Sequence, residues 1–263
     1  MQIDLSGRRA LVTGSTEGIG FAIARGLAAA GAQVVVNGRD QDKTVAAVQR
    51  LEAEFGVRAE AAAADLGNAE GCDDLVEQVA DVDILINNLG TYGMEDFFVT
   101  SDATWERFFQ VNVMSGVRLS RAYLPHMQTQ NWGRVVFISS ESAFNIPPDM
   151  IHYGMSKTAQ VSIARGLAKR MAGTGVTVNS VLPGPTLSDG LKRALAPLAA
   201  QQGESVEALA TGFVHRARPS SIIQRPATVE EVANMVVYVA SPQASATTGA
   251  ALRVDGGVVD MIV

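Results

Sequence analysis

Short runs of apolar, mostly β-branched residues alternate with longer segments of helical periodicity along almost the whole chain. Several of the short runs are continuously apolar, which is typical of parallel strands that helices cover on both faces. The segments between them are long enough to hold the crossover helices that parallel strands need. The pattern therefore predicts an α/β fold with a doubly wound sheet. We expect strands at 10–12, 33–36, 58–62, 83–86, 134–138, 177–181 and 251–254.

Helical periodicity also predicts where the crossover helices lie. The last of them has a clear start, because Thr228 and Glu231 have the spacing of a capping box. The segment 184–226 is different, since it mixes Gly, Pro and polar residues with two weaker helical patterns near 191–198 and 206–213. Segments this long often cover a site, so we expect a mobile substrate flap. The main helices are expected at 19–30, 41–55, 68–79, 102–127, 153–171 and 228–240.

Length and composition limit the classes of function. The 263 residues contain no low-complexity tract and no repeat, so we expect a single domain over 1–263. A net charge of −6 argues against a nucleic-acid partner. No segment approaches the roughly 18 apolar residues of a membrane span, and we expect a cytoplasmic protein without a membrane partner. Cys72, the one cysteine, is expected to be a packing residue, with a catalytic thiol as the less favoured alternative.

A glycine-rich segment, 13–20 (TGSTEGIG), joins the first strand to the first helix. Glycines permit a tight turn and a close approach of the backbone to a pyrophosphate, and a helix start offers free amides. The spacing G-x-x-x-G-x-G differs from the more common G-x-G-x-x-G, but its place between strand and helix strengthens the signal. The segment predicts a dinucleotide site, the alternative being a plain glycine-rich turn.

The residues after the second strand bear on the choice between NADP and NAD. In such folds this segment meets the adenosine ribose, and an acidic residue there would favour NAD. Here Gly38 is at the expected strand end and Arg39 can pair with a 2′-phosphate, which favours NADP. Glu17 and Asp40 bring negative charge that opposes this preference. A merely solvated Arg39, and NAD as the cofactor, therefore stay open.

Two later strand ends carry further candidate cofactor contacts. Asp65 follows the third strand, where its carboxylate can accept a hydrogen bond from the adenine amino group or cap a helix. Asn88 and Gly90 follow the fourth strand, where an amide can tie strand ends together and a glycine allows the backbone to approach a ribose. A purely structural role is equally compatible with this segment.

The chemically most informative set is Tyr153, Lys157 and Ser140. The i, i+4 spacing places the phenol and the ammonium on one helix face. A tyrosine normally loses its proton near pH ~10, so a nearby positive charge is needed for acid/base work at neutral pH. Ser140 ends the fifth strand, and strand ends of an open parallel sheet line one crevice. We therefore expect Ser140 and Tyr153 to face the same substrate carbonyl.

Together these motifs resemble the short-chain dehydrogenase/reductase family over nearly the whole chain, from Gly7 to Gly257. The resemblance implies a seven-stranded, mainly parallel Rossmann sheet in the order 3-2-1-4-5-6-7 and an NAD(P)-dependent oxidoreductase. It implies that Tyr153 transfers the proton, that Ser140 orients the substrate and that Asn112 holds a water in a relay through Lys157. It also implies a homotetramer or dimer. The expected cofactor contacts are Gly14, Ser15, Thr16, Gly18, Ile19, Gly20, Asn37, Arg39, Asp65, Leu66, Asn88, Gly90, Tyr153, Lys157, Pro183, Gly184 and Thr186.

The substrate is expected to be a small molecule, a ketone or secondary alcohol of the sugar, polyol or oxoacyl class. Glu141, Asn145 and His152 are the candidate substrate contacts, and no ligand spacing predicts a metal. Two alternatives stay open. One is an epimerase or dehydratase with permanently bound cofactor, and the other is a non-catalytic dinucleotide sensor or scaffold.

Overall fold

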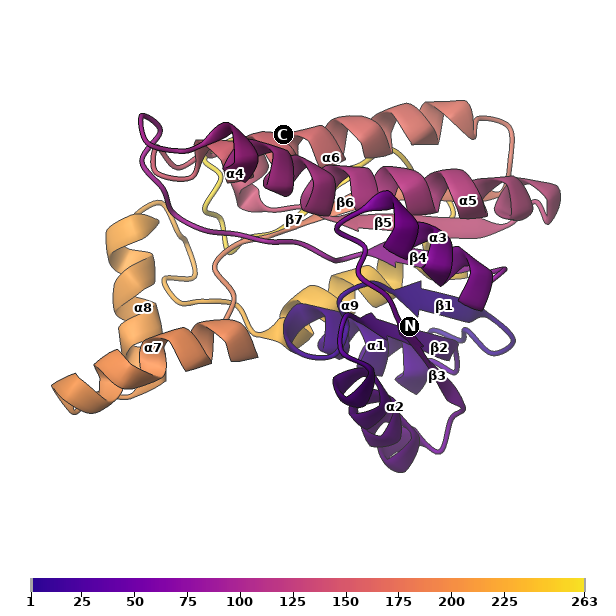
Figure 1. The fold of residues 1–263 in the computed structure, drawn as a ribbon, viewed down its shortest axis with the longest axis horizontal. Helices are drawn as coiled ribbons and strands as arrows, with labels where there is room; N and C mark the ends of the chain where they lie inside the picture. Colours follow the sequence, from indigo (N-terminus) through magenta and orange to yellow (C-terminus); the bar gives the residue numbers. More distant parts are fainter. Residues whose placement is uncertain (1, 263) are drawn as a thin grey trace.

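The computed structural model describes residues 2–262, and their strands form a parallel sheet in the order β3-β2-β1-β4-β5-β6-β7 (Figure 1). This order confirms the predicted doubly wound fold. Each strand lies within two residues of its expected place, since continuously apolar runs mark strands buried on both faces. The strands are β1 (Arg9–Val12), β2 (Gln33–Gly38), β3 (Ala59–Ala63), β4 (Ile84–Asn87), β5 (Gly133–Ile138), β6 (Val176–Pro183) and β7 (Ala251–Val254).

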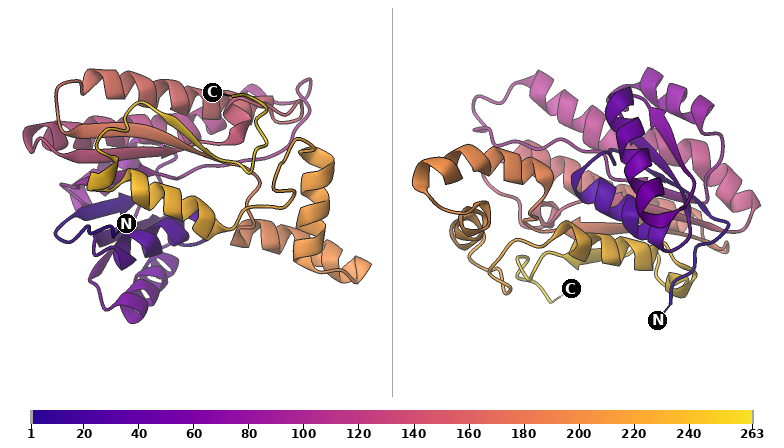
Figure 2. Two further views of the ribbon diagram at one scale, coloured as in Figure 1. Left: turned by 180° about the vertical axis from the view of Figure 1, so that it is seen from behind. Right: turned by 90° about the horizontal axis from the view of Figure 1, so that it is seen from below.

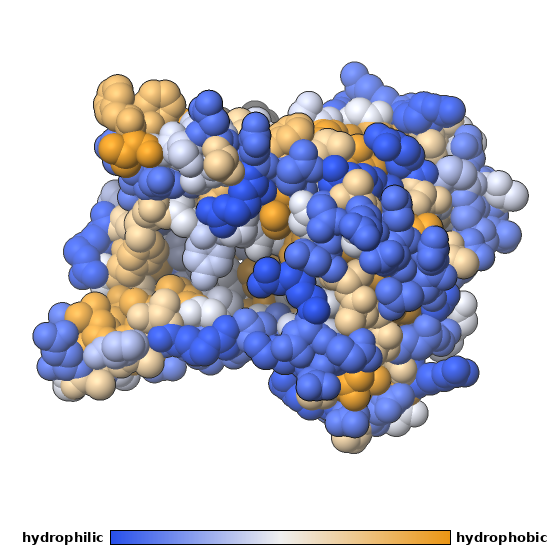
Figure 3. Space-filling model, viewed as in Figure 1, coloured by the Kyte–Doolittle hydropathy of each residue, from blue (hydrophilic) through white to orange (hydrophobic). Residues whose placement is uncertain are grey.

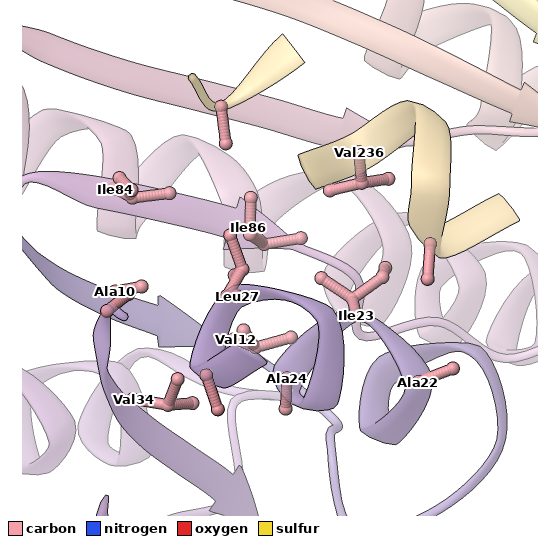
Figure 4. Packing of buried hydrophobic residues seen from close by; sticks show 14 of the residues in the cluster. Ala10, Val12, Ala22, Ile23, Ala24, Leu27, Val34, Ile84, Ile86 and Val236 are labelled. Carbon is pink, nitrogen blue, oxygen red and sulfur yellow. The ribbon is translucent and has the colours of Figure 1, made fainter. Parts of the chain in front are cut away.

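Helices cover both faces of the sheet, and each face has its own buried apolar cluster. On one face α1 (Gly18–Ala29), α2 (Gln41–Phe55) and α9 (Val229–Val239) pack on the strands. Figure 4 shows side chains of α1 between strand residues and Val236 of α9. On the other face lie α3 (Ala69–Gln78), α5 (Ser115–Thr129) and α6 (Ile151–Arg170). None of the helices within residues 2–262 combines the length and apolar character that crossing a membrane requires.

Two local predictions about these helices are confirmed. The capping box of α9 is present, with the Thr228 hydroxyl accepting from the Glu231 amide and the Glu231 carboxylate accepting from the Thr228 amide. Cys72 is buried in α3, where its thiol donates to the Leu66 carbonyl oxygen. Burial raises the pKa of this thiol, so the residue has the properties of a packing group rather than of a nucleophile.

The expected continuous helix 102–127 is wrong in one respect. It is divided into α4 (Asp102–Phe108), a π-helical segment, Phe109–Met114 (η1), and α5. A π turn inserts an extra residue and diverts backbone carbonyls from their usual partners. Here the carbonyl oxygen of Asn112 accepts from the Gln160 side chain of α6, at 2.6 Å. The apolar periodicity of the sequence does not distinguish this segment from an ordinary helix.

The flap contains two complete helices, α7 (Asp189–Gln202) and α8 (Val206–Ala217), longer than the weak patterns indicated. Ser188 and Ser205 cap them by accepting from the amides of Leu191 and Ala208. In Figures 1 and 2 both helices project from the body beyond the carboxyl ends of the strands. The space-filling view in Figure 3 is hollowed between this projection and the rest of the molecule. The flap therefore borders the end of the sheet where a ligand crevice is expected.

Candidate active site

The glycine-rich turn between β1 and α1 is held in one shape by the protein itself. Gly14 and Gly18 have φ angles of +59° and +60°, a region that other residues rarely adopt. The Asn88 amide donates to the carbonyl oxygens of Thr13 and Gly14 at 2.8 and 2.9 Å. A Cβ on Gly20 would lie only 2.3 Å from the Gly14 oxygen. Positive φ angles at Gly14 and Gly18, and the lack of space for a side chain at Gly20, thus require glycine in this preformed turn.

The same turn has the donors that an anionic group needs. The Gly18 amide, at the start of α1, donates to the Asp189 carboxylate at 3.0 Å, so an anionic oxygen is already bound at this helix end. The next amide, that of Ile19, has no acceptor within residues 2–262. A helix start with free amides and a glycine floor is suited to a pyrophosphate. The residues present here therefore fit a dinucleotide.

Gly20→Ala is expected to reduce NADPH affinity at least tenfold. The new methyl group would collide with the Gly14 carbonyl oxygen and, at 2.5 Å, with the Asn88 amide, so the turn must open. Fluorescence titration with NADPH measures the loss, and circular dichroism checks that the sheet persists. Wild-type affinity in a folded variant would contradict the assignment of the pyrophosphate site.

Several expected cofactor contacts have structural partners instead. Asn37 is buried, with its side chain accepting from the Gly14 amide and donating to the Ala62 carbonyl oxygen. The Ser15 hydroxyl donates to the Val12 carbonyl oxygen, and Leu66 is buried in the core. The side chains of Asn37 and Ser15 thus bind backbone atoms at the ends of the strands that border the expected cofactor site. Contact of these residues with a cofactor stays a prediction. Because their side chains have partners within the protein, such a contact would be made by exposed backbone atoms.

Within residues 2–262 neither Asp40 nor Glu17 is paired with Arg39. Arg39 is exposed just beyond β2. The Asp40 carboxylate caps α2 by accepting from the Lys43 amide. Glu17 forms a two-pronged ion pair with Arg193 of α7, at 2.6 and 2.9 Å. Both acidic groups that opposed an NADP preference therefore have other partners.

The remaining cofactor candidates lie along the strand ends. Asp65 is exposed, and its carboxylate accepts from the Gly67 amide. A Cβ on Gly90 would be 3.4 Å from the Lys157 ammonium, so this backbone adjoins the reacting groups. Gly184 follows β6, and its carbonyl oxygen accepts from the Thr186 hydroxyl. These residues follow the carboxyl ends of β3, β4 and β6, on the edge of the sheet where a ligand crevice is expected.

Tyr153 and Lys157 lie on the same face of α6, as their spacing predicted. The Lys157 ammonium nitrogen is 5.6 Å from the centroid of the Tyr153 ring. Burial raises the pKa of Tyr153 to about 12, while a hydrogen bond with Ser140 and the positive charge of Arg218 oppose this rise. Burial lowers the pKa of Lys157 to about 7. The phenol, the hydroxyl and the amine thus lie close together, with Ser140 and Lys157 buried and Tyr153 partly buried.

Gln160, one turn beyond Lys157, is a residue that the sequence analysis missed. Its side-chain oxygen accepts from the Lys157 ammonium at 3.2 Å, and its side-chain nitrogen donates to the Asn112 carbonyl oxygen. The lysine also donates to the Ile138 carbonyl oxygen at 2.9 Å. Gln160 thus links the Asn112 backbone to the Lys157 ammonium, and the water relay that the resemblance implied stays a prediction. A polar residue three positions after the lysine, on the same helix face, was the available signal.

Asn112 itself is completely buried beside this bridge. Its side-chain oxygen accepts from the Thr91 amide at 2.7 Å, and its side-chain nitrogen donates to the Ser156 hydroxyl at 2.9 Å. These bonds join the π-helical segment to α6 and to the loop after β4. Asn112 therefore supports the position of Lys157 through its backbone and through Gln160.

The three expected substrate contacts have different surroundings. Asn145 is exposed in the loop before α6. His152 is buried, with its ring edge-to-face against Phe108 at 4.4 Å, a packing that does not favour its expected substrate contact. Glu141 is buried and pairs with Arg218, which follows α8. Arg218 was also missed, because nothing in its local sequence separates it from the exposed arginine two residues earlier.

Comparisons with known proteins agree with this arrangement. A family model described as short chain dehydrogenase matches residues 8–199. The chain is 47% identical to an uncharacterised oxidoreductase of Bacillus subtilis, YvaG, over 98% of both chains. It is 31% identical to a 3-oxoacyl-acyl-carrier-protein reductase of Aquifex aeolicus, over 98% of this chain and 99% of that protein.

Among solved structures, L-sorbose reductase from Gluconobacter frateurii, complexed with NADPH and L-sorbose, is similar over 100% of both chains. The TM-score is 0.93 and the sequence identity 31%. Fold, motif positions and relatives thus agree. The chain belongs to the short-chain dehydrogenase family and is an oxidoreductase that uses a nicotinamide cofactor.

Proposed function

We propose that the protein transfers hydride between NADP(H) and a ketone or secondary alcohol, with Tyr153 as the general acid/base. The observation that carries the proposal is the convergence of three groups at one strand end. The side chain of Ser140 lies close enough to the phenol to lower the pKa of Tyr153, and the Lys157 ammonium lies 5.6 Å from the centroid of the phenol ring. Acid/base transfer to a carbonyl oxygen needs such a proton donor beside groups that stabilise negative charge.

The bound nicotinamide supplies or accepts the hydride. In the reducing direction, the Tyr153 phenol donates its proton to the substrate oxygen, which the Ser140 hydroxyl orients. The phenolate that remains is stabilised by the positive charge of Lys157. Gln160 accepts a hydrogen bond from that lysine and donates one to the Asn112 carbonyl oxygen, so both residues fix the position of the ammonium group. The glycine-rich turn, Asp65, Asn88, Gly90 and the segment 183–186 would hold the cofactor along the carboxyl ends of the strands, where the strand order reverses between β1 and β4.

Arg39→Ser is expected to lower kcat/KM with NADPH by roughly 10–100-fold and to leave NADH turnover nearly unchanged. A charge-assisted hydrogen bond contributes about 1.5–3 kcal/mol, and only NADPH carries a 2′-phosphate for this arginine. Steady-state rates with both cofactors measure the change in preference. Arg58→Ser removes an equally exposed charge before β3 and is the control. Equal losses with NADH and NADPH would contradict the assigned role.

The substrate class is tested by NADPH consumption with two probes. L-sorbose is the substrate in the similar L-sorbose reductase complex, and an acetoacetyl thioester represents the 3-oxoacyl relatives. We expect turnover with at least one of the two or with a related polyol ketone or oxoacyl ester. A folded protein that binds NADPH but reduces none of these compounds would favour the sensor alternative over the enzyme.

We also propose self-association, as the resemblance implied, to a homotetramer or dimer. The contact surface would lie on α4, α5 and α6, where Phe109 of the π-helical segment is 40% exposed. Sedimentation velocity that shows only monomer at micromolar concentration would contradict this proposal.

A further inference from the structure

Glu141 is a buried carboxylate beside the reacting serine. It follows β5 in a short 3-10 turn, Glu141–Ala143 (η2), and its side chain is 4% exposed. A carboxylate loses most of its hydration in such a place and needs hydrogen-bond donors and a positive charge to compensate. Its surroundings therefore indicate what the residue does.

The two carboxylate oxygens of Glu141 have different partners. One accepts from the Ser140 hydroxyl at 2.8 Å and also from the Ser142 hydroxyl. The other accepts from Nε of Arg218 at 2.6 Å. Arg218, with a side chain that is 13% exposed, lies directly after α8, and its guanidinium also donates to the Ala217 carbonyl oxygen. One buried ion pair thus connects the substrate flap to the reacting serine.

This connection constrains the single proton of the Ser140 hydroxyl. The Ser140 oxygen already accepts from the Ser142 amide at 3.1 Å. Its proton can go either to the Glu141 carboxylate or to an oxygen in the active site, but not to both at once. The position and charge of Glu141 therefore decide how readily Ser140 donates to the substrate oxygen or to a Tyr153 phenolate.

We propose that Glu141 is a positioning residue for Ser140, and that Arg218 holds Glu141 in place only while the flap is closed. Closure of the flap and orientation of the serine are then one event. A charge-assisted bond between the two, at 2.6 Å and largely buried, is strong enough for this role. The proposal rests on the proposed function of Ser140 and Tyr153, and it assigns the flap a part in preparing the reacting groups.

The charges near Tyr153 give the proposal a signature that simple packing would lack. The groups that face the phenol are Glu141, Tyr92, Arg218 and Lys157. Glu141 raises the pKa of Tyr153 and Arg218 lowers it, so the two residues act in opposite directions. Glu141→Gln and Arg218→Gln should therefore move the pH profile of the reaction in opposite directions, although both break the same link.

The experiment measures oxidation of the alcohol product of the better probe, with NADP⁺, as a function of pH. The phenolate is the active base in this direction, so the acid limb of the profile follows the Tyr153 pKa. We expect Glu141→Gln to shift this limb down by about one pH unit and Arg218→Gln to shift it up by about as much. Glu207→Gln and Arg216→Gln, both exposed on α8, are the matched controls and should leave the limb in place.

A second readout is independent of activity. Hydrogen exchange of the amides in α8 should accelerate in both variants and in neither control, because each variant releases the flap. Unchanged exchange, or an acid limb that does not move while only KM rises, would overturn the proposal and leave Glu141 as a plain substrate contact. Failure of the proposed function would give a different result. The wild-type protein would then turn over neither probe, while hydrogen exchange in α8 would still be faster in Arg218→Gln than in the wild type.

Discussion

Tyr153→Phe is expected to lower kcat/KM for the better ketone probe by roughly 10²–10⁴-fold, the range for loss of a general acid. The variant removes one oxygen atom from a partly buried side chain, so the ring keeps its packing against Phe108. What is lost is the proton that the substrate oxygen needs. NADPH consumption in the steady state measures the effect, and NADPH fluorescence should show that cofactor affinity changes little.

Tyr238→Phe is the matched control, because this half-buried tyrosine lies on α9, on the other face of the sheet from α6. It should keep the wild-type rate. Turnover by Tyr153→Phe at more than a tenth of the wild-type rate would mean that another group donates the proton. The candidates would then be Ser140 or a water that enters the site.

The fold was largely predictable because its strands carry their own signal. A continuously apolar strand such as β5 or β6 is stable only between two layers of helices, and its ends were placed within two residues. The π-helical segment was not predictable in this way. Its Asn112 carbonyl oxygen accepts from the Gln160 side chain, which lies 48 residues further along the chain. Local periodicity contains no information about such a distant contact.

The candidate site also contains contacts that local sequence predicts and contacts between distant residues that it does not predict. Tyr153 and Lys157 are four residues apart on one helix, so their meeting follows from helix geometry alone. Glu141 and Arg218 are 77 residues apart, and they meet only because the flap folds back over the strand ends. Sequence spacing therefore indicated the pair for which we propose the reaction. Sequence reasoning gave Glu141 as a possible substrate contact in a loop. The structure shows it buried and paired with Arg218, a residue that no sequence motif indicated.

Lys157→Met is the second variant with a large expected effect, a loss of roughly 10²–10³-fold in kcat/KM, as for removal of one group that stabilises developing charge. Methionine nearly matches the length of lysine but cannot stabilise a phenolate or donate to the Ile138 and Gln160 oxygens. Lys169→Met, at an exposed position of the same helix, is the control and should retain full activity. Equal rates for Lys157→Met and wild type would remove the lysine from the mechanism.

The same variant tests whether the lysine is dehydrated in the folded protein. Burial lowers the pKa of Lys157 to about 7 from 10.5, so between these values the unfolded chain binds more protons than the folded one. Between these two pKa values the free energy of unfolding of the wild type must then rise with pH relative to that of Lys157→Met, by at most about 1.4 kcal/mol per pH unit. Below the folded pKa the difference between the two proteins must be constant. Urea unfolding at several pH values from about 6 to 9.5 measures this slope before the tyrosines titrate. A flat difference across that range would show that the Lys157 ammonium keeps its hydration in the folded protein, and burial would then not be what sets its charge beside Tyr153.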